Sequence, residues 1–128
     1  MILPLPRTAL VAVGGLVGSV ARYWLSGAVQ ELTGHVFPSG TLVVNIVGSF
    51  VLGVVMALSL DRGLLDDELR ILLSTGFCGG FTTMSTFSYE TFALLRDGER
   101  VLALANVCAT LGVCLAAAWL GNVVARAF

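Results

Sequence analysis

Lysine is absent from this sequence of 128 residues, and its seven basic side chains are all arginines. Charged residues of both signs make up 12% of the chain and nearly cancel, which leaves a net charge of −1 at pH 7. Proteins that bind nucleic acid carry clustered positive charge. The few scattered arginines therefore predict that nucleic acid is not a partner.

Cysteine and histidine are also scarce, with three and one residues respectively. The cysteines, Cys78, Cys108 and Cys114, lie in apolar runs at spacings that match neither a paired metal-binding motif nor a disulfide framework. No nucleophile, base and orienting group occur together in the sequence. We therefore expect a protein that is not an enzyme.

Long runs without charge are what the sequence has in abundance. Hydrophobic residues make up 57% of the chain and the mean hydropathy is +0.95, more than a small soluble domain can bury. Each run can cross a bilayer as a helix of about 20 residues. We therefore predict an all-α membrane protein with a single domain, residues 1–128, and four transmembrane helices at about 8–30, 40–60, 69–95 and 101–126.

The third predicted span contains a segment that does not suit a continuous helix. Between Gly76 and Ser88, three glycines fall within five residues and several Ser and Thr hydroxyls follow them. Each glycine disfavours helix by up to about 1 kcal/mol relative to alanine, so we expect a break midway, around Gly79 to Thr82. A break at membrane depth must be buried in protein or line a wet cavity, and its free carbonyls suit a cation. The alternative is a helix contact made through hydroxyl and aromatic side chains.

Other polar side chains lie inside the spans. Asn45 is the only strongly polar residue in the apolar body of the second span, and it either joins helices or lines a conduction route. Arg22 either snorkels to the headgroups or faces a vestibule that attracts anions. Glu90 lies about 12 Å beyond Thr82 along a helix, which places it near a mouth. A faint polar stripe in the fourth span, either helix contact or conduction route, comprises Asn106, Thr110 and Cys114.

The arginines give almost no orientation bias. Four spans put Arg7, Arg62, Arg70 and Arg126 on one side of the membrane and the other three on the opposite side. Orientation normally follows an excess of positive charge on the cytoplasmic side. Near-equality predicts an antiparallel, dual-topology homodimer, unless one arginine alone decides orientation. Four thin helices also leave little room for a water-filled path, so a pore needs a second subunit.

Three motifs resemble the Fluc fluoride channels, also called CrcB proteins. They are Gly14-Gly15-x-x-Gly18-x-x-x-Arg22-Tyr23, Gly40-Thr41-Leu42-x-x-Asn45-x-x-Gly48, and the continuous segment from Gly76 to Ser88. The order and spacing of the motifs make the resemblance specific, and it extends over essentially the whole chain. The resemblance implies passive, fluoride-selective export across the cell membrane of a prokaryote by a dimer of oppositely oriented subunits.

The resemblance also implies site residues. The carbonyls of Gly79 and Thr82 from both chains would hold a structural sodium ion at the dimer interface. Asn45, Ser85 and Thr86 would lie near the fluoride path, with Thr110 and Cys114 further along it. Two phenylalanines edge this path in the family, but the corresponding residues here are Met84 and Phe87. A thioether lacks the positive edge of an aromatic ring, and the thiol of Cys114 is a weaker donor than the hydroxyl expected nearby.

Two other functions compete with a channel. A four-span dimeric exporter of small cations coupled to protons needs a carboxylate deep in an early span, and neither of the first two predicted spans contains one. A membrane subunit that transports nothing would use the same polar residues only to hold helices together. Flux measurements in liposomes separate all three.

Overall fold

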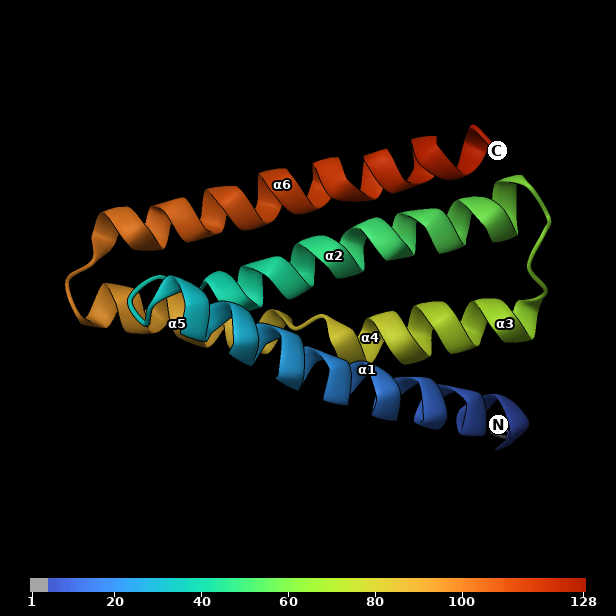
Figure 1. Ribbon diagram of the computed structural model, residues 1–128, viewed down its shortest axis with the longest axis horizontal. Coiled ribbons are helices and arrows are strands. Elements are labelled where there is room, and N and C mark those ends of the chain that lie inside the picture. Colours follow the sequence, from blue (N-terminus) through green and yellow to red (C-terminus); the bar gives the residue numbers. More distant parts are fainter. Residues whose placement is uncertain (1–4) are drawn as a thin grey trace.

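The computed structural model describes residues 5–128. Its helices form rows, each made of one or more consecutive helices, that run back and forth between the two ends of the molecule (Figure 1). The elements are, in chain order, α1 (Leu5–Thr33), α2 (Ser39–Met56), η1 (Ala57–Asp61), α3 (Asp67–Ile71), η2 (Leu72–Cys78), α4 (Gly79–Phe81), α5 (Met84–Arg96) and α6 (Arg100–Arg126). Because η1 and η2 are π-helical, they continue their rows with a wider turn. The start of α1 and the end of α6 lie at the same end (Figure 1).

Three helices are long and apolar enough to cross a membrane among the described residues. They are Pro6–Thr33, Ser39–Asp61 and Arg100–Arg126. The remaining row consists of α3, η2, α4 and α5, and it is interrupted after α4. The expected all-helical fold with an interrupted third row is confirmed, while the passage of that row through the bilayer stays a prediction.

Glycines let the helices approach closely. The most extensive contact joins α2 to α6, where a Cβ added to Gly53 would lie 2.2 Å from the Ala118 carbonyl oxygen. On the other side of the molecule α1 packs against η2, where a Cβ added to Gly18 would lie 2.2 Å from the Phe77 carbonyl oxygen. Small residues allow such close backbone contact between helices in lipid.

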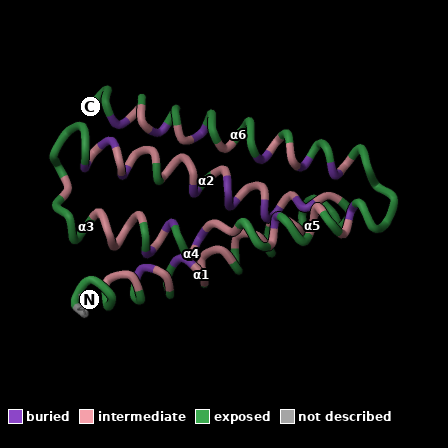
Figure 2. The backbone as a smooth tube through the Cα atoms, turned by 180° about the vertical axis from the view of Figure 1, so that it is seen from behind, coloured by how far each residue is buried: buried purple, intermediate pink, exposed green. Residues whose placement is uncertain are grey.

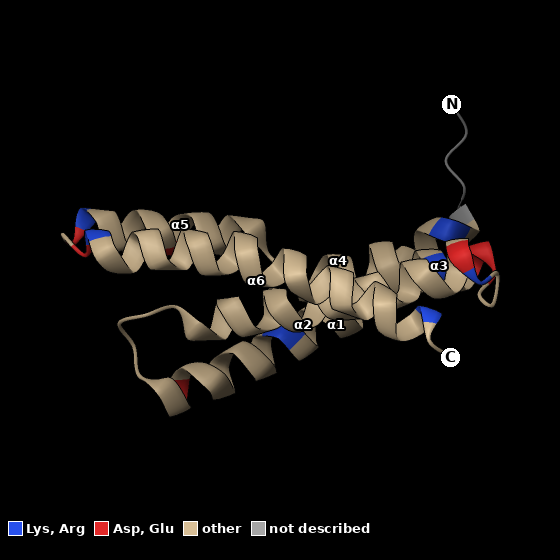
Figure 3. Cartoon of the chain, turned by 90° about the horizontal axis from the view of Figure 1, so that it is seen from above, with Lys and Arg blue, Asp and Glu red and all other residues tan. Residues whose placement is uncertain are grey.

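Burial and charge divide the surface in a pattern typical of a membrane protein. Buried positions follow the faces where α2 meets its neighbours, and much of the outer face is exposed (Figure 2). Large apolar side chains on that face include Leu16, Trp24 and Leu115. Charged residues gather at the two ends with few between them (Figure 3). This distribution leaves an apolar belt for lipid or for a second subunit.

Candidate ion-binding site

The interruption lies at the C-terminal end of the predicted range, Gly79 to Thr82. Gly79 has helical backbone angles, φ −61° and ψ −38°, and the helix continues to Phe81. Extended backbone occurs at Thr82, with φ −91° and ψ 160°, and at Thr83, with φ −153° and ψ 118°. The glycines serve packing instead, since a Cβ on Gly80 would lie 2.6 Å from the Gly15 carbonyl oxygen. The predicted break is therefore confirmed at Thr82, while the glycines before it remain helical.

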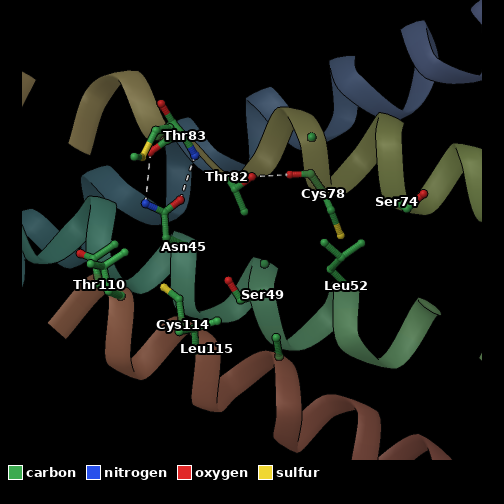
Figure 4. Close-up of a pocket in the computed structure, with 15 residues that line it drawn as sticks. Asn45, Ser49, Leu52, Ser74, Cys78, Thr82, Thr83, Thr110, Cys114 and Leu115 are labelled. Atoms are coloured by element: carbon green, nitrogen blue, oxygen red, sulfur yellow. Dashed lines mark hydrogen bonds between the residues drawn. The ribbon is translucent and has the colours of Figure 1, made fainter. Parts of the chain in front are cut away.

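Asn45 on α2 holds the extended segment. Its side-chain oxygen accepts a hydrogen bond from the Thr83 backbone N–H at 2.8 Å, and its amide nitrogen donates to the Thr83 carbonyl at 3.1 Å (Figure 4). The side-chain amide thus replaces the helical partners that both Thr83 groups lose. Because Asn45 is only 9% exposed, water competes little for these bonds.

The hydroxyl of Thr83 starts the helix that follows. It accepts a hydrogen bond from the Thr86 backbone N–H at 3.2 Å and donates to the Thr86 hydroxyl at 3.0 Å. This is an N-cap interaction, which satisfies one of the free N–H groups at a helix start. Thr83 was not among the predicted site residues, although the preference of threonine for the N-cap position was a signal in the sequence.

The interruption leaves specific carbonyl oxygens without partners. In an α-helix the Gly79 carbonyl bonds the Thr83 N–H and the Thr82 carbonyl bonds the Thr86 N–H, four residues on. Asn45 and the Thr83 hydroxyl have taken these two donors. Within residues 5–128, neither carbonyl accepts another hydrogen bond. These are the two carbonyls that family resemblance assigns to sodium.

Arg22 lies behind the interruption and not in open solvent. Its Nε donates to the Gly80 carbonyl oxygen at 3.0 Å, across 58 positions of sequence. Positive side chains stabilise the carbonyl end of a helix. The guanidinium therefore caps the α4 end of the interrupted row, a role distinct from both interpretations of the sequence.

A cavity of about 460 Å³ opens beside the interruption. Six of the predicted site residues line it: Asn45, Gly79, Thr82, Met84, Thr110 and Cys114 (Figure 4). Its walls are mainly apolar and also include Ser49, Leu52, Ser74 and Cys78. The Thr110 hydroxyl oxygen is buried and has no hydrogen-bond partner among the described residues. A buried hydroxyl without a partner remains available to a bound ion or water.

Three residues predicted to lie near the fluoride path are on α5 outside the cavity lining. Ser85 is exposed, and Thr86 bonds Thr83 as described. The Phe87 side chain is 7% exposed, in contrast to Met84, which is 68% exposed. The two residues of the expected aromatic pair therefore have different surroundings within one chain.

Glu90 lies in a second, smaller cavity of about 260 Å³ near the connection between α1 and α2. Gln30, His35 and Asp97 also line this cavity. One carboxylate oxygen of Glu90 is buried without a hydrogen-bond partner in the described part of the chain. Its place beside this connection is compatible with the predicted mouth.

Asn106, the buried polar residue at the start of the α6 stripe, joins two helices. Its amide donates to the Thr91 hydroxyl at 2.9 Å, and this hydroxyl in turn donates to the Phe87 carbonyl at 2.8 Å. The polar residues of this stripe therefore have two roles: Asn106 makes a helix contact, whereas Thr110 and Cys114 line the cavity.

Comparisons with known proteins agree on one family. The family model described as CrcB-like protein, Camphor Resistance (CrcB), matches residues 9–122. A protein of Geotalea uraniireducens (strain Rf4) is 54% identical over 117 residues, which cover 91% of this chain and 94% of that protein. A protein of Geobacter sulfurreducens is 53% identical over 116 residues, with coverage of 91% and 94%. Both relatives are named fluoride-specific ion channel FluC.

Proposed function

We propose that this chain, which belongs to the CrcB-like family, is a channel that lets fluoride leave the cell down its gradient. Relatives about half identical over nine-tenths of the chain carry the name of a fluoride-specific channel. The observation that carries the proposal is the cavity beside the interrupted row, which is lined by Thr110 with its unpaired hydroxyl and by Gly79 and Thr82, whose carbonyls have no hydrogen-bond partner in the described chain. Such interruptions mark ion sites in membrane proteins.

The fluoride path in this proposal runs along the cavity. Fluoride is small and strongly hydrated, so protein donors must replace its water before an apolar passage admits it. Thr110 offers its unpaired hydroxyl, and Asn45 retains one amide N–H after bonding Thr83. Cys114 and Met84 supply further polarizable surface on the same walls.

Residues beyond the cavity complete the proposed route. Ser85, Thr86 and Phe87 belong to it through the family resemblance, and a second subunit would bring them to the path. Arg22 adds positive charge near the interruption, and Glu90 marks the end of the route. We expect a narrow passage to exclude the larger halides.

A structural sodium ion fits the chemistry of the interruption. Carbonyl oxygens are hard ligands, and those of unwound helices coordinate sodium in other membrane proteins. Gly79 and Thr82 each present such an oxygen without a hydrogen-bond partner in the described chain. A bound sodium ion would contribute fixed positive charge that favours an anion nearby.

Assembly as an antiparallel homodimer follows from the same site. One chain offers the Gly79 and Thr82 carbonyls at this site, and two copies related by a twofold axis would offer four. The arginine count of four against three permits insertion in both orientations. The exposed apolar belt offers the surface that a second copy needs.

Fluoride efflux from liposomes containing the purified protein tests the function. We expect electrogenic fluoride release without a proton gradient and no chloride release from matched vesicles. Cation flux that depends on a proton gradient would support the exporter, and no flux of either kind would support a subunit that transports nothing. Labelling of a C-terminal tag from both sides of the membrane tests dual topology, since a single orientation exposes the tag on one side.

A further inference from the structure

One face of α2 meets the interruption at two residues spaced three apart, Asn45 and Gly48. Asn45 bonds both backbone groups of Thr83. At Gly48 the absence of a side chain makes room for Thr82, because an added Cβ would lie 2.2 Å from the Thr82 Cγ2 atom and 3.2 Å from the Phe81 Cδ2 atom. Carbon atoms that are not bonded to each other do not approach to 2.2 Å. The Thr82 methyl group therefore occupies the space that a side chain at Gly48 would fill, which we call the Gly48 notch.

The two branches of the Thr82 side chain are therefore both engaged. Its hydroxyl donates to the Cys78 carbonyl at 2.8 Å, while its methyl group fills the notch. Rotation about χ1 would break this hydrogen bond or lift the methyl group out of the notch. The side chain thus fixes the position of the Thr82 Cα atom relative to α2.

The direction of the Thr82 carbonyl follows from the next peptide. The Thr82 C=O and the Thr83 N–H belong to one planar trans unit and point in opposite directions. Since the Thr83 N–H points to Asn45, the Thr82 carbonyl points away from Asn45. The carbonyl is thereby held free of α2, as a cation ligand requires.

We propose that Gly48 is a positioning residue for the cation site: its notch holds the Thr82 methyl group and so fixes the position of Thr82, whose carbonyl the Asn45 hydrogen bond turns away from α2. This inference rests on the sodium site of the proposed function. It adds a residue that neither bonds an ion nor forms a hydrogen bond through a side chain. Glycine is required at position 48 for steric reasons, so an alanine there should be tolerated once the methyl group of Thr82 is removed.

The experiment compares Gly48→Ala, Thr82→Ser and the double variant. Thr82→Ser retains the carbonyl and the hydroxyl but removes the methyl group that Gly48→Ala would strike. Gly53→Ala is the matched control, because it inserts a methyl group on the same helix 2.2 Å from the Ala118 carbonyl oxygen, on the side facing α6. The readout is the sodium concentration that gives half of the sodium-dependent rise in melting temperature in detergent.

We expect Gly48→Ala to raise that concentration about tenfold or more, since overpacking of a tight contact of this kind costs on the order of tenfold in an equilibrium constant. Thr82→Ser should leave the concentration unchanged, and the double variant should return close to the wild-type value. Gly53→Ala should lower the melting temperature without changing the sodium concentration required.

Several outcomes would overturn the proposal. An unchanged sodium requirement in Gly48→Ala, or a double variant as impaired as Gly48→Ala, would show that the notch does not position Thr82 for the cation. If Gly48→Ala fails to fold, restored folding in the double variant supports the steric contact and continued failure refutes it. A wild-type protein insensitive to sodium would refute the cation site itself, and fluoride efflux from liposomes made with the same preparation shows whether the channel function survives.

Discussion

Replacing Asn45 with aspartate changes one amide nitrogen to an oxygen and leaves the shape of the side chain almost unaltered. In the wild type this nitrogen donates to the Thr83 carbonyl at 3.1 Å. After Asn45→Asp two acceptors face each other at that distance. The Thr83 N–H keeps its acceptor, so the variant removes one of the two bonds that hold the interruption and adds a negative charge to the cavity wall.

The magnitude follows from these two changes. An unsatisfied carbonyl in a buried site costs about 1–3 kcal/mol of stability. A fluoride ion at about 8 Å from the new charge is repelled by about 2 kcal/mol at an effective dielectric constant of 20. This repulsion alone slows passage about 30-fold. We therefore expect fluoride efflux at neutral pH to fall at least 30-fold, together with a lower melting temperature.

The assay is the initial rate of fluoride efflux from liposomes, read with a fluoride electrode and normalised to folded protein. Asn45→Leu separates the two effects, because it removes both hydrogen bonds without adding charge. Acidification should partly restore Asn45→Asp, since a protonated carboxyl is neutral and can donate to the Thr83 carbonyl. Liposomes without protein correct for passage of hydrogen fluoride. If Asn45→Asp released fluoride at the wild-type rate at neutral pH, the result would refute both the role of Asn45 in holding Thr83 and its placement on the fluoride path.

Three further changes probe other parts of the structure. Arg22→Lys keeps both a donor and the positive charge at the Gly80 carbonyl, whereas Arg22→Gln keeps only a donor, so capping predicts that Arg22→Gln lowers the melting temperature more, and a vestibule role predicts that Arg22→Gln also lowers efflux per folded protein. Met84→Phe restores the aromatic edge of the family at an exposed cavity position and should leave efflux within about threefold of wild type, a change of less than 1 kcal/mol; a loss of efflux would show that the cavity requires the thioether. Asp61→Asn removes a partly exposed ion pair with Arg126 at 3.0 Å and should lower the free energy of unfolding by at most about 1 kcal/mol in chemical denaturation, with unchanged efflux.

The sequence alone determined the class of the protein and the order of its parts. Charge-free runs of this length have no stable alternative to membrane helices, because a bilayer leaves backbone groups no other partners. The unusual composition between Gly76 and Ser88 was enough to predict that the third row is interrupted, and the three motifs were enough to indicate the family.

Only the tertiary structure decided where the interruption falls and what holds it. Helix propensity favours a break at the glycines, yet Gly79 and Gly80 remain helical because α1 packs directly against this segment. The break occurs at Thr82 and Thr83, since Asn45, 38 positions earlier than Thr83, takes the backbone N–H that would have continued the helix. A hydrogen bond between distant residues leaves no periodic trace in a sequence. The same contact leaves the Gly79 carbonyl free, so part of the chemistry of the site depends on packing that local sequence does not encode.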